Sequence, residues 1–151
     1  MKPIVALTDF SPNSLNAVNY AADMACMLGL DLNLLHVYSI PVPVSEVPVA
    51  VLDPEDLEAT ATKEIEKLGE KLLTRTSGRI VVHTAVRPGS VLQEVISYCK
   101  TILPHAVVMG AESTNQFERV FLGGKTVDAL KKIEWPLIIV PPNVSFNNIR
   151  K

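Results

Sequence analysis

The chain has 151 residues, of which 48% are hydrophobic and 20% charged, and its formal net charge is −2. This length fits one domain and excludes two full domains, and the composition excludes a disordered chain. The near balance of charge gives no basic face for duplex nucleic acid. The apolar runs fall far short of the roughly 18 residues of a membrane span. The N-terminal apolar stretch is too short for a signal-peptide core, so we expect a cytosolic protein.

Apolar runs with β character alternate with helical patterns along the whole chain. Most of the runs lack strict polar alternation, which is typical of strands that are covered on both faces of a parallel sheet. The alternation predicts an α/β fold with right-handed crossovers. We expect strands over residues 4–7, 32–37, 80–86, 106–109 and 137–140.

Capping residues predict where the first two helices begin and end. Ser11 is a predicted N-cap, with Pro12 at the first helical position, and Gly29 is expected to end this helix. Asp53 and Pro54 begin the second helix in the same way.

The rest of the chain continues this order with one departure. Ser90 and Gln93 form a capping-box pattern that predicts a third helix, which Pro104 stops. Apolar positions 127, 130 and 133 mark a fourth helix. Residues 41–54 carry four prolines and are predicted to form an extended surface connection.

Cysteines and histidines give no metal or redox pattern. Cys26 and Cys99 lack a CxxC spacing and are most simply small core residues. His36, His83 and His105 share no ligand spacing and are interpreted as structural. No metal site is therefore predicted.

A ligand site is expected at the carboxyl ends of the strands, because parallel α/β sheets bind ligands where the strand order reverses. The loop with Thr8 and Asp9 follows the first strand, and the loop that starts at Gly110 follows the fourth. If the strand order is 3-2-1-4-5, the two loops face each other. Asp9 could then accept hydrogen bonds from a base or ribose, while N–H groups near Gly123 and Gly124 take phosphate oxygens.

Each of these residues also has a simpler interpretation. Asp9 could do no more than support the Ser11 cap, and Gly110 could be a turn residue that needs a positive φ. Lys125 could be solvated, and Thr126 could be only an N-cap.

Known catalytic motifs are absent from the sequence. The string Gly-Gly-Lys-Thr at 123–126 resembles the end of a P-loop, but that motif requires glycine five positions before Gly124, where this chain has Arg119. No GxGxxG, HExxH or GxSxG pattern occurs either. We therefore predict no catalytic residue.

Three segments resemble the universal stress protein family: VALTDFSPNSLNAVNYAADMA at 5–25, LLHVYS at 34–39, and residues 107–141. The resemblance implies a three-layer sandwich with a five-stranded parallel sheet of order 3-2-1-4-5, the adenine-nucleotide alpha-hydrolase-like fold. It also implies a domain over residues 1–142 and a C-terminal tail over 143–151. This tail is similar to the linker between tandem copies in some relatives.

ATP-binding members of this family carry the motif G-x2-G-x9-G-[ST]. Gly110 and Gly123 match its first and third glycines, whereas Ser113 and Gly124 replace the second glycine and the hydroxyl residue. One lost hydroxyl hydrogen bond costs about tenfold in affinity at most. Lys125 could offset this loss as a point charge near phosphate, and Thr126 could supply a displaced hydroxyl.

The resemblance also implies nucleoside contacts for Thr8, Asp9, Val37, Met109 and Gly110. It implies a stress-response protein that binds ATP or AMP, with Mg²⁺ in the case of ATP, and without strong catalysis. A nucleotide hydrolase is less favoured, since no residue beyond Asp9 points to a metal or a positioned water.

The alternative is a dimeric interaction module of the same family that binds no nucleotide and contacts a partner through residues 41–54. Relatives commonly pair the last strand with its copy, which implies a homodimer through the segment from Pro136 to Val140.

Overall fold

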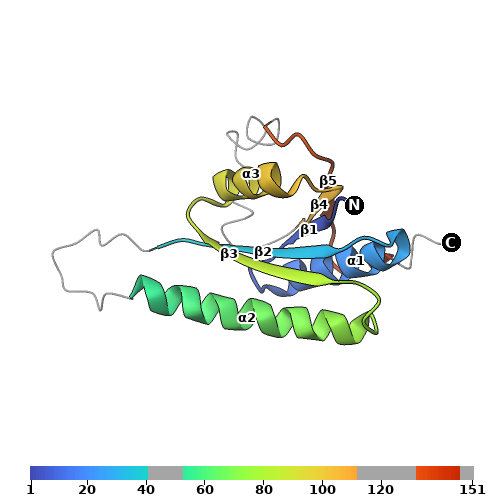
Figure 1. Ribbon diagram of the computed structural model, residues 1–151, viewed down its shortest axis with the longest axis horizontal. Helices are drawn as coiled ribbons and strands as arrows, with labels where there is room; N and C mark the ends of the chain where they lie inside the picture. The colour runs from blue at the N-terminus through green and yellow to red at the C-terminus, as the bar shows by residue number, and fades with distance from the viewer. Residues whose placement is uncertain (41–52, 112–131, 147–151) are drawn as a thin grey trace.

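The computed structural model describes residues 1–40, 53–111 and 132–146, and its strands form one parallel sheet (Figure 1). The sheet order is β3-β2-β1-β4-β5, which confirms the predicted order. The strands are β1 (Ile4–Leu7), β2 (Leu32–Tyr38), β3 (Val82–Pro88), β4 (Ala106–Gly110) and β5 (Leu137–Val140). The helices are α1 (Pro12–Leu28), α2 (Pro54–Arg75) and α3 (Val91–Ile102).

Helices cover both faces of the sheet, as the predicted three-layer sandwich requires. Alternate residues of β1 point to opposite faces, because successive side chains of a strand alternate. Ile4 and Ala6 pack against α1 and α2, whereas Val5 and Leu7 pack on the side of α3. All four are at most 2% exposed, so β1 forms the centre of the hydrophobic core.

The predicted starts of the three described helices are confirmed. Ser11 is the N-cap of α1, and its hydroxyl accepts a hydrogen bond from the Ser14 N–H at 3.3 Å. Gly29 ends α1 in the left-handed conformation, with φ of 67°. Asp53 caps α2 by accepting from the Glu55 N–H at 3.0 Å. Ser90 lies at the N-cap of α3 but its side chain makes no capping hydrogen bond, so that part of the capping-box prediction is wrong.

Strand β3 begins and ends two residues later than predicted. It lies at the edge of the sheet and pairs with β2 from Leu32 opposite Val82 to Tyr38 opposite Pro88. The length of β2 sets these bounds, so the apolar residue Ile80 is buried without belonging to the strand. The predicted fourth helix around 127–133, apart from its last two residues, and residues 41–52 of the predicted connection lie outside the described residues.

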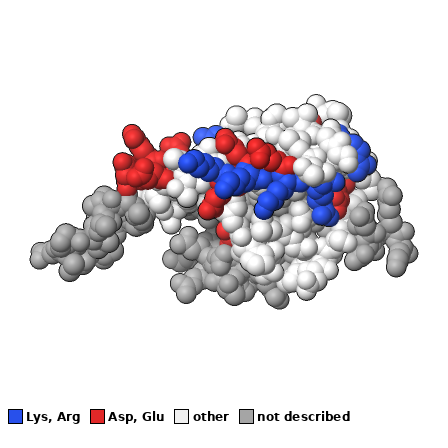
Figure 2. Space-filling model, turned by 90° about the horizontal axis from the view of Figure 1, so that it is seen from below, with Lys and Arg blue, Asp and Glu red and all other residues white. Residues whose placement is uncertain are grey.

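The outer face of α2 is charged in neighbouring rows of opposite sign. Lys63, Lys67 and Lys71 follow one another at four-residue spacing, and all three are exposed. Figure 2 shows basic side chains beside acidic ones on this face of the molecule. Arg75 extends this row of basic residues. Its guanidinium forms an ion pair with Asp23 of α1 at 3.0 Å, which links the two helices. Among the described residues, no helix is long and apolar enough to cross a membrane.

The two serine caps give a matched stability test. Ser11→Ala removes a side-chain hydrogen bond at the start of α1 and should lower the free energy of unfolding by about 1 kcal/mol. Ser90→Ala removes no such bond and should change it by less than about 0.5 kcal/mol. Urea unfolding measures both, and equal losses in the two variants would contradict the assigned caps.

Candidate functional site

A network of hydroxyl hydrogen bonds closes the turn between β1 and α1. Thr8 is fully buried, and its Oγ1 lies 3.0 Å from the Ser14 Oγ. The Ser14 hydroxyl donates its only proton to the Ser11 carbonyl at 3.0 Å, so Thr8 is the donor to Ser14. The Phe10 N–H in turn donates to the Thr8 Oγ1 at 3.0 Å. The turn is therefore held by side chains from both of its ends.

Asp9 lies half-buried in the middle of this turn. Its Oδ1 accepts a hydrogen bond from the Ser11 N–H at 3.0 Å, and its own N–H donates to the Ser14 Oγ at 3.3 Å. The simpler role foreseen for Asp9, support of the Ser11 cap, is confirmed as a contact. This contact holds the carboxylate at the N-terminus of α1, where the helix dipole favours negative charge.

Strand β2 forms hydrogen bonds to the same turn from the other side. The Thr8 N–H donates to the Leu35 carbonyl at 3.0 Å, and His36 Nδ1 lies 2.8 Å from the Thr8 carbonyl. A carbonyl can only accept, so His36 Nδ1 carries the proton. The His36 ring packs 4.7 Å from the ring of Phe10, a residue with φ of +64°. His36 is therefore structural, as predicted, and it positions the turn.

Gly110 ends β4 directly against the first turn of α1. A Cβ at this position would lie 2.9 Å from the Asn13 carbonyl oxygen and 3.1 Å from its carbon. The foreseen need for a positive φ is wrong, because the positive-φ glycines of the described chain do not include Gly110. Glycine is required here for close backbone approach. Ala6 pairs with Val108, so continuing the register by two residues sets Thr8 beside Gly110.

The other two predicted nucleoside contacts, Val37 and Met109, lie at the same carboxyl end of the sheet, on the face that α3 covers. Val37 and Met109 are 7% and 4% exposed and belong to one apolar cluster with Leu7, which lies on the strand between them. A hollow of about 370 Å³ lies just beyond the ends of β2 and β3, lined by Ser39, Ile40, Pro88 and Gly89.

Five of the ten predicted site residues thus lie together at the carboxyl end of the sheet. The other five lie outside the described residues: Ser113, Gly123, Gly124, Lys125 and Thr126. Sequence reasoning missed the roles of Ser14 and His36 in positioning Asp9. The spacing Ser11-x-x-Ser14 was a usable signal for the first, whereas no local pattern links His36 to Thr8 across two strands.

The described residues contain no metal cluster and no reactive buried thiol. No group of three or more His, Cys, Asp or Glu side chains in residues 1–40, 53–111 and 132–146 is arranged to hold a metal ion. Cys99 is buried, and desolvation raises the pKa of its thiol to about 11, so it stays protonated at neutral pH. The carboxyl end of the sheet combines the hydrogen-bonded Asp9 carboxylate with a close-packed backbone at Gly110 and an apolar cluster.

Comparison with known proteins identifies a family and similar folds. The model of the universal stress protein family matches residues 1–141. No curated protein matches this chain. The universal stress protein UspA from Lactobacillus plantarum is a similar solved structure, with a TM-score of 0.69 and 20% identity, covering 92% of this chain and 97% of that one.

Two other similar structures are complexes with a nucleotide. A universal stress protein in complex with cAMP has a TM-score of 0.63 and 16% identity, covering 94% of this chain and 98% of that one. A universal stress protein from Archaeoglobus fulgidus in complex with dAMP has a TM-score of 0.59 and 16% identity, covering 93% and 98%. At these identities the likeness shows the fold.

The close approach at Gly110 predicts a stability effect. Gly110→Ala sets a methyl group against the Asn13 backbone, which cannot rotate away, and should lower the free energy of unfolding by about 1–3 kcal/mol. Gly69→Ala is the control. Its Cβ would meet only side-chain atoms, of Thr84 at 3.3 Å and of Val82 at 3.6 Å, and alanine gains about 1 kcal/mol of helix propensity. Thermal unfolding in which Gly69→Ala is the more damaging change would contradict this account.

Proposed function

We propose that this chain, which belongs to the universal stress protein family, binds an adenine nucleotide at the carboxyl ends of β1 and β4. The observation that carries the proposal is the fixed Asp9 turn beside Gly110, where the backbones of β4 and α1 touch. Crevices where the strand order reverses are the usual ligand sites of such sheets. In the order β3-β2-β1-β4-β5, the reversal lies between β1 and β4.

The residues at the carboxyl end of the sheet fit the nucleoside part of such a ligand. The Asp9 carboxylate can accept hydrogen bonds from ribose hydroxyls or from an adenine amino group. The apolar side chains of Val37 and Met109 lie on the neighbouring strands, where a planar base can pack. The cAMP and dAMP complexes of two similar proteins support the adenine class of ligand.

The phosphate part of the ligand depends on the segment with Ser113 and residues 123–126. This segment lies outside the described residues, so contacts from Gly123, Gly124, Lys125 and Thr126, and a Mg²⁺ ion with ATP, remain predictions. We propose that the protein holds or senses ATP or AMP in the cytosol during stress, without strong catalysis. We assign this role to the domain over residues 1–142.

Nucleotide binding predicts a thermal stabilisation that depends on Asp9. At a ligand concentration of 100 times the Kd, AMP or Mg-ATP should stabilise the wild-type chain by about 2.7 kcal/mol. Asp9→Ala should abolish this shift, because it removes the carboxylate. Asp31→Ala is a matched control at the opposite end of β2, where the only ion pair of Asp31 in the described part of the chain is with His83.

Differential scanning fluorimetry with millimolar nucleotide measures these shifts. A wild-type chain that neither AMP nor Mg-ATP stabilises would contradict the proposed function. A shift that survives Asp9→Ala as fully as Asp31→Ala would contradict the proposed site.

The exposed edge of β5 favours a second proposed property, a homodimer through the segment from Pro136 to Val140. Among the described strands β5 pairs only with β4, so its other edge is open. Ile139 is 48% exposed on this strand. An open apolar edge is usually covered, and a second copy related by a twofold axis is the commonest cover. A partner contact at residues 41–54 remains a prediction.

The dimer is tested by charge on this edge. Ile139→Lys should convert a dimer into a monomer at micromolar concentration, because a two-fold interface brings two added charges together. Val81→Lys is the control, since Val81 is 53% exposed and precedes β3 at the far edge of the sheet. Light scattering measures the mass. A wild-type monomer would refute the dimer, and an Ile139→Lys variant that still dimerises would refute this interface.

A further inference from the structure

The peptide unit between Thr8 and Asp9 is held at both ends by side chains of other elements. His36 Nδ1–H, on β2, donates to its carbonyl at 2.8 Å, and its N–H donates to the Ser14 Oγ of α1 at 3.3 Å. A peptide unit is planar, so two hydrogen bonds on opposite sides of it fix its rotation. This rotation sets the direction in which the Asp9 carboxylate leaves the end of β1.

Of these two hydrogen bonds, the one from His36 is the stronger restraint. Its length of 2.8 Å is at the short end of the usual range for an N–H donor, whereas the bond to Ser14 is 3.3 Å long. The Ser14 Oγ is also shared, because it accepts from the Thr8 hydroxyl at 3.0 Å. The orientation of the peptide unit before Asp9 therefore depends mainly on His36.

The ring of His36 also supports the residue that follows Asp9. Phe10 has φ of +64°, in the left-handed region that side-chain-bearing residues rarely adopt. Its ring centroid lies 4.7 Å from that of His36, with the two planes tilted by 53°. His36 thus makes two separate contributions: an N–H donor to the peptide unit before Asp9, and a ring surface for the residue after it.

A peptide unit without such bonds has more than one orientation. Rotation about the bonds on either side of it turns the carbonyl away, while the strand before it and the helix after it stay in place. A site that occupies several orientations must be ordered when its ligand arrives, and this ordering lowers affinity. The hydrogen bond from His36 therefore prepares the turn before any ligand is present.

We propose that His36 is a positioning residue of the nucleoside site, and that its Nδ1–H sets the affinity for the ligand by holding the peptide unit before Asp9. This inference rests on the proposed function, because it concerns the same ligand. His36 acts through the Asp9 carboxylate, which is assigned to the nucleoside part. Loss of the donor therefore weakens adenosine and AMP by the same factor.

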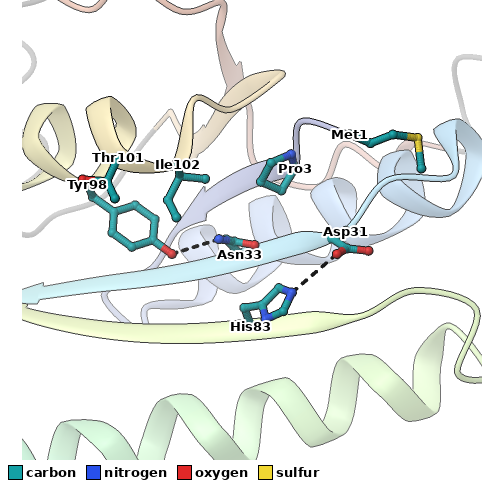
Figure 3. A pocket seen from close by; sticks show the side chains of 8 residues that line it. All are labelled: Met1, Pro3, Asp31, Asn33, His83, Tyr98, Thr101 and Ile102. Atoms are coloured by element: carbon teal, nitrogen blue, oxygen red, sulfur yellow. Dashed lines mark hydrogen bonds and ion pairs between the residues drawn. The ribbon is translucent and has the colours of Figure 1, made fainter.

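His83 on the adjacent strand provides a matched control. It lies at the amino end of the sheet, in a pocket of about 420 Å³, and its Nε2 pairs with Asp31 at 3.4 Å (Figure 3). About half of the His83 side chain is exposed, and its partner is a side chain instead of a backbone carbonyl. His83→Phe should therefore leave the affinity for AMP unchanged.

Two substitutions separate the donor of His36 from its ring. His36→Asn keeps an N–H donor on the atom bonded to Cγ but has no ring, whereas His36→Phe keeps a ring without a donor. Isothermal titration calorimetry of the full chain with AMP measures the Kd. His36→Phe should weaken binding about tenfold, because it removes one hydrogen bond, and His36→Asn should stay within about threefold of the wild-type chain.

Hydrogen exchange of the nucleotide-free chain gives a readout that does not depend on a ligand. The Asp9 amide should exchange faster in His36→Phe than in His36→Asn or in the wild-type chain, because its peptide unit is released. Equal exchange in the three chains would overturn the inference. His36→Leu, which also lacks a donor, replaces His36→Phe if that variant does not fold.

The titrations distinguish this inference from the proposed function. A wild-type chain that binds neither AMP nor adenosine would refute both. If the wild-type chain binds, unchanged affinity in His36→Phe, or an equal loss in His36→Asn, would overturn the role of the Nδ1 hydrogen bond alone. A loss for AMP without a loss for adenosine would overturn the route through Asp9.

Discussion

The contact between the Gly110 backbone and the first turn of α1 is the constraint that sets the arrangement of residues at the carboxyl end of the sheet. A Cβ at Gly110 would lie 2.9 Å from the Asn13 carbonyl oxygen, so the end of β4 is set directly against the start of α1. The turn that carries Asp9 must then fit between the end of β1 and this helix. The hydrogen bonds of Thr8 and Ser14 close the turn in that space. The position of the carboxylate thus follows from a backbone contact on the neighbouring strand.

A turn held in this way is suited to binding. The N–H groups of Asp9, Phe10 and Ser11 donate to the side chains of Ser14, Thr8 and Asp9, and the Thr8 carbonyl accepts from His36. Few groups need ordering when a ligand arrives, and such preorganisation favours affinity. The amino end of the same sheet differs, because the Asn33 Oδ1 is buried without a partner.

Local signals predicted the features that depend on neighbouring residues in the chain. Ser11 with Pro12 and Gly29 marked the ends of α1 because caps are set by residues within one turn of the helix end. Features that depend on distant residues escaped prediction. The bounds of β3 follow from pairing with β2, and Gly110 is required because of Asn13, 97 positions earlier by residue number. The strand order and the nucleoside contacts came from the family resemblance, since periodicity does not specify which strands are neighbours.

The central claim is that the Asp9 turn and the end of β4 form one nucleoside site. A crystal structure of the full chain grown with saturating AMP tests it most directly. The account predicts electron density for the nucleoside at the carboxyl ends of β1, β2 and β4, with a hydrogen bond to the Asp9 carboxylate and the base beside Val37. Density for AMP at another surface, or no density at the carboxyl end of the sheet when AMP is saturating, would contradict it.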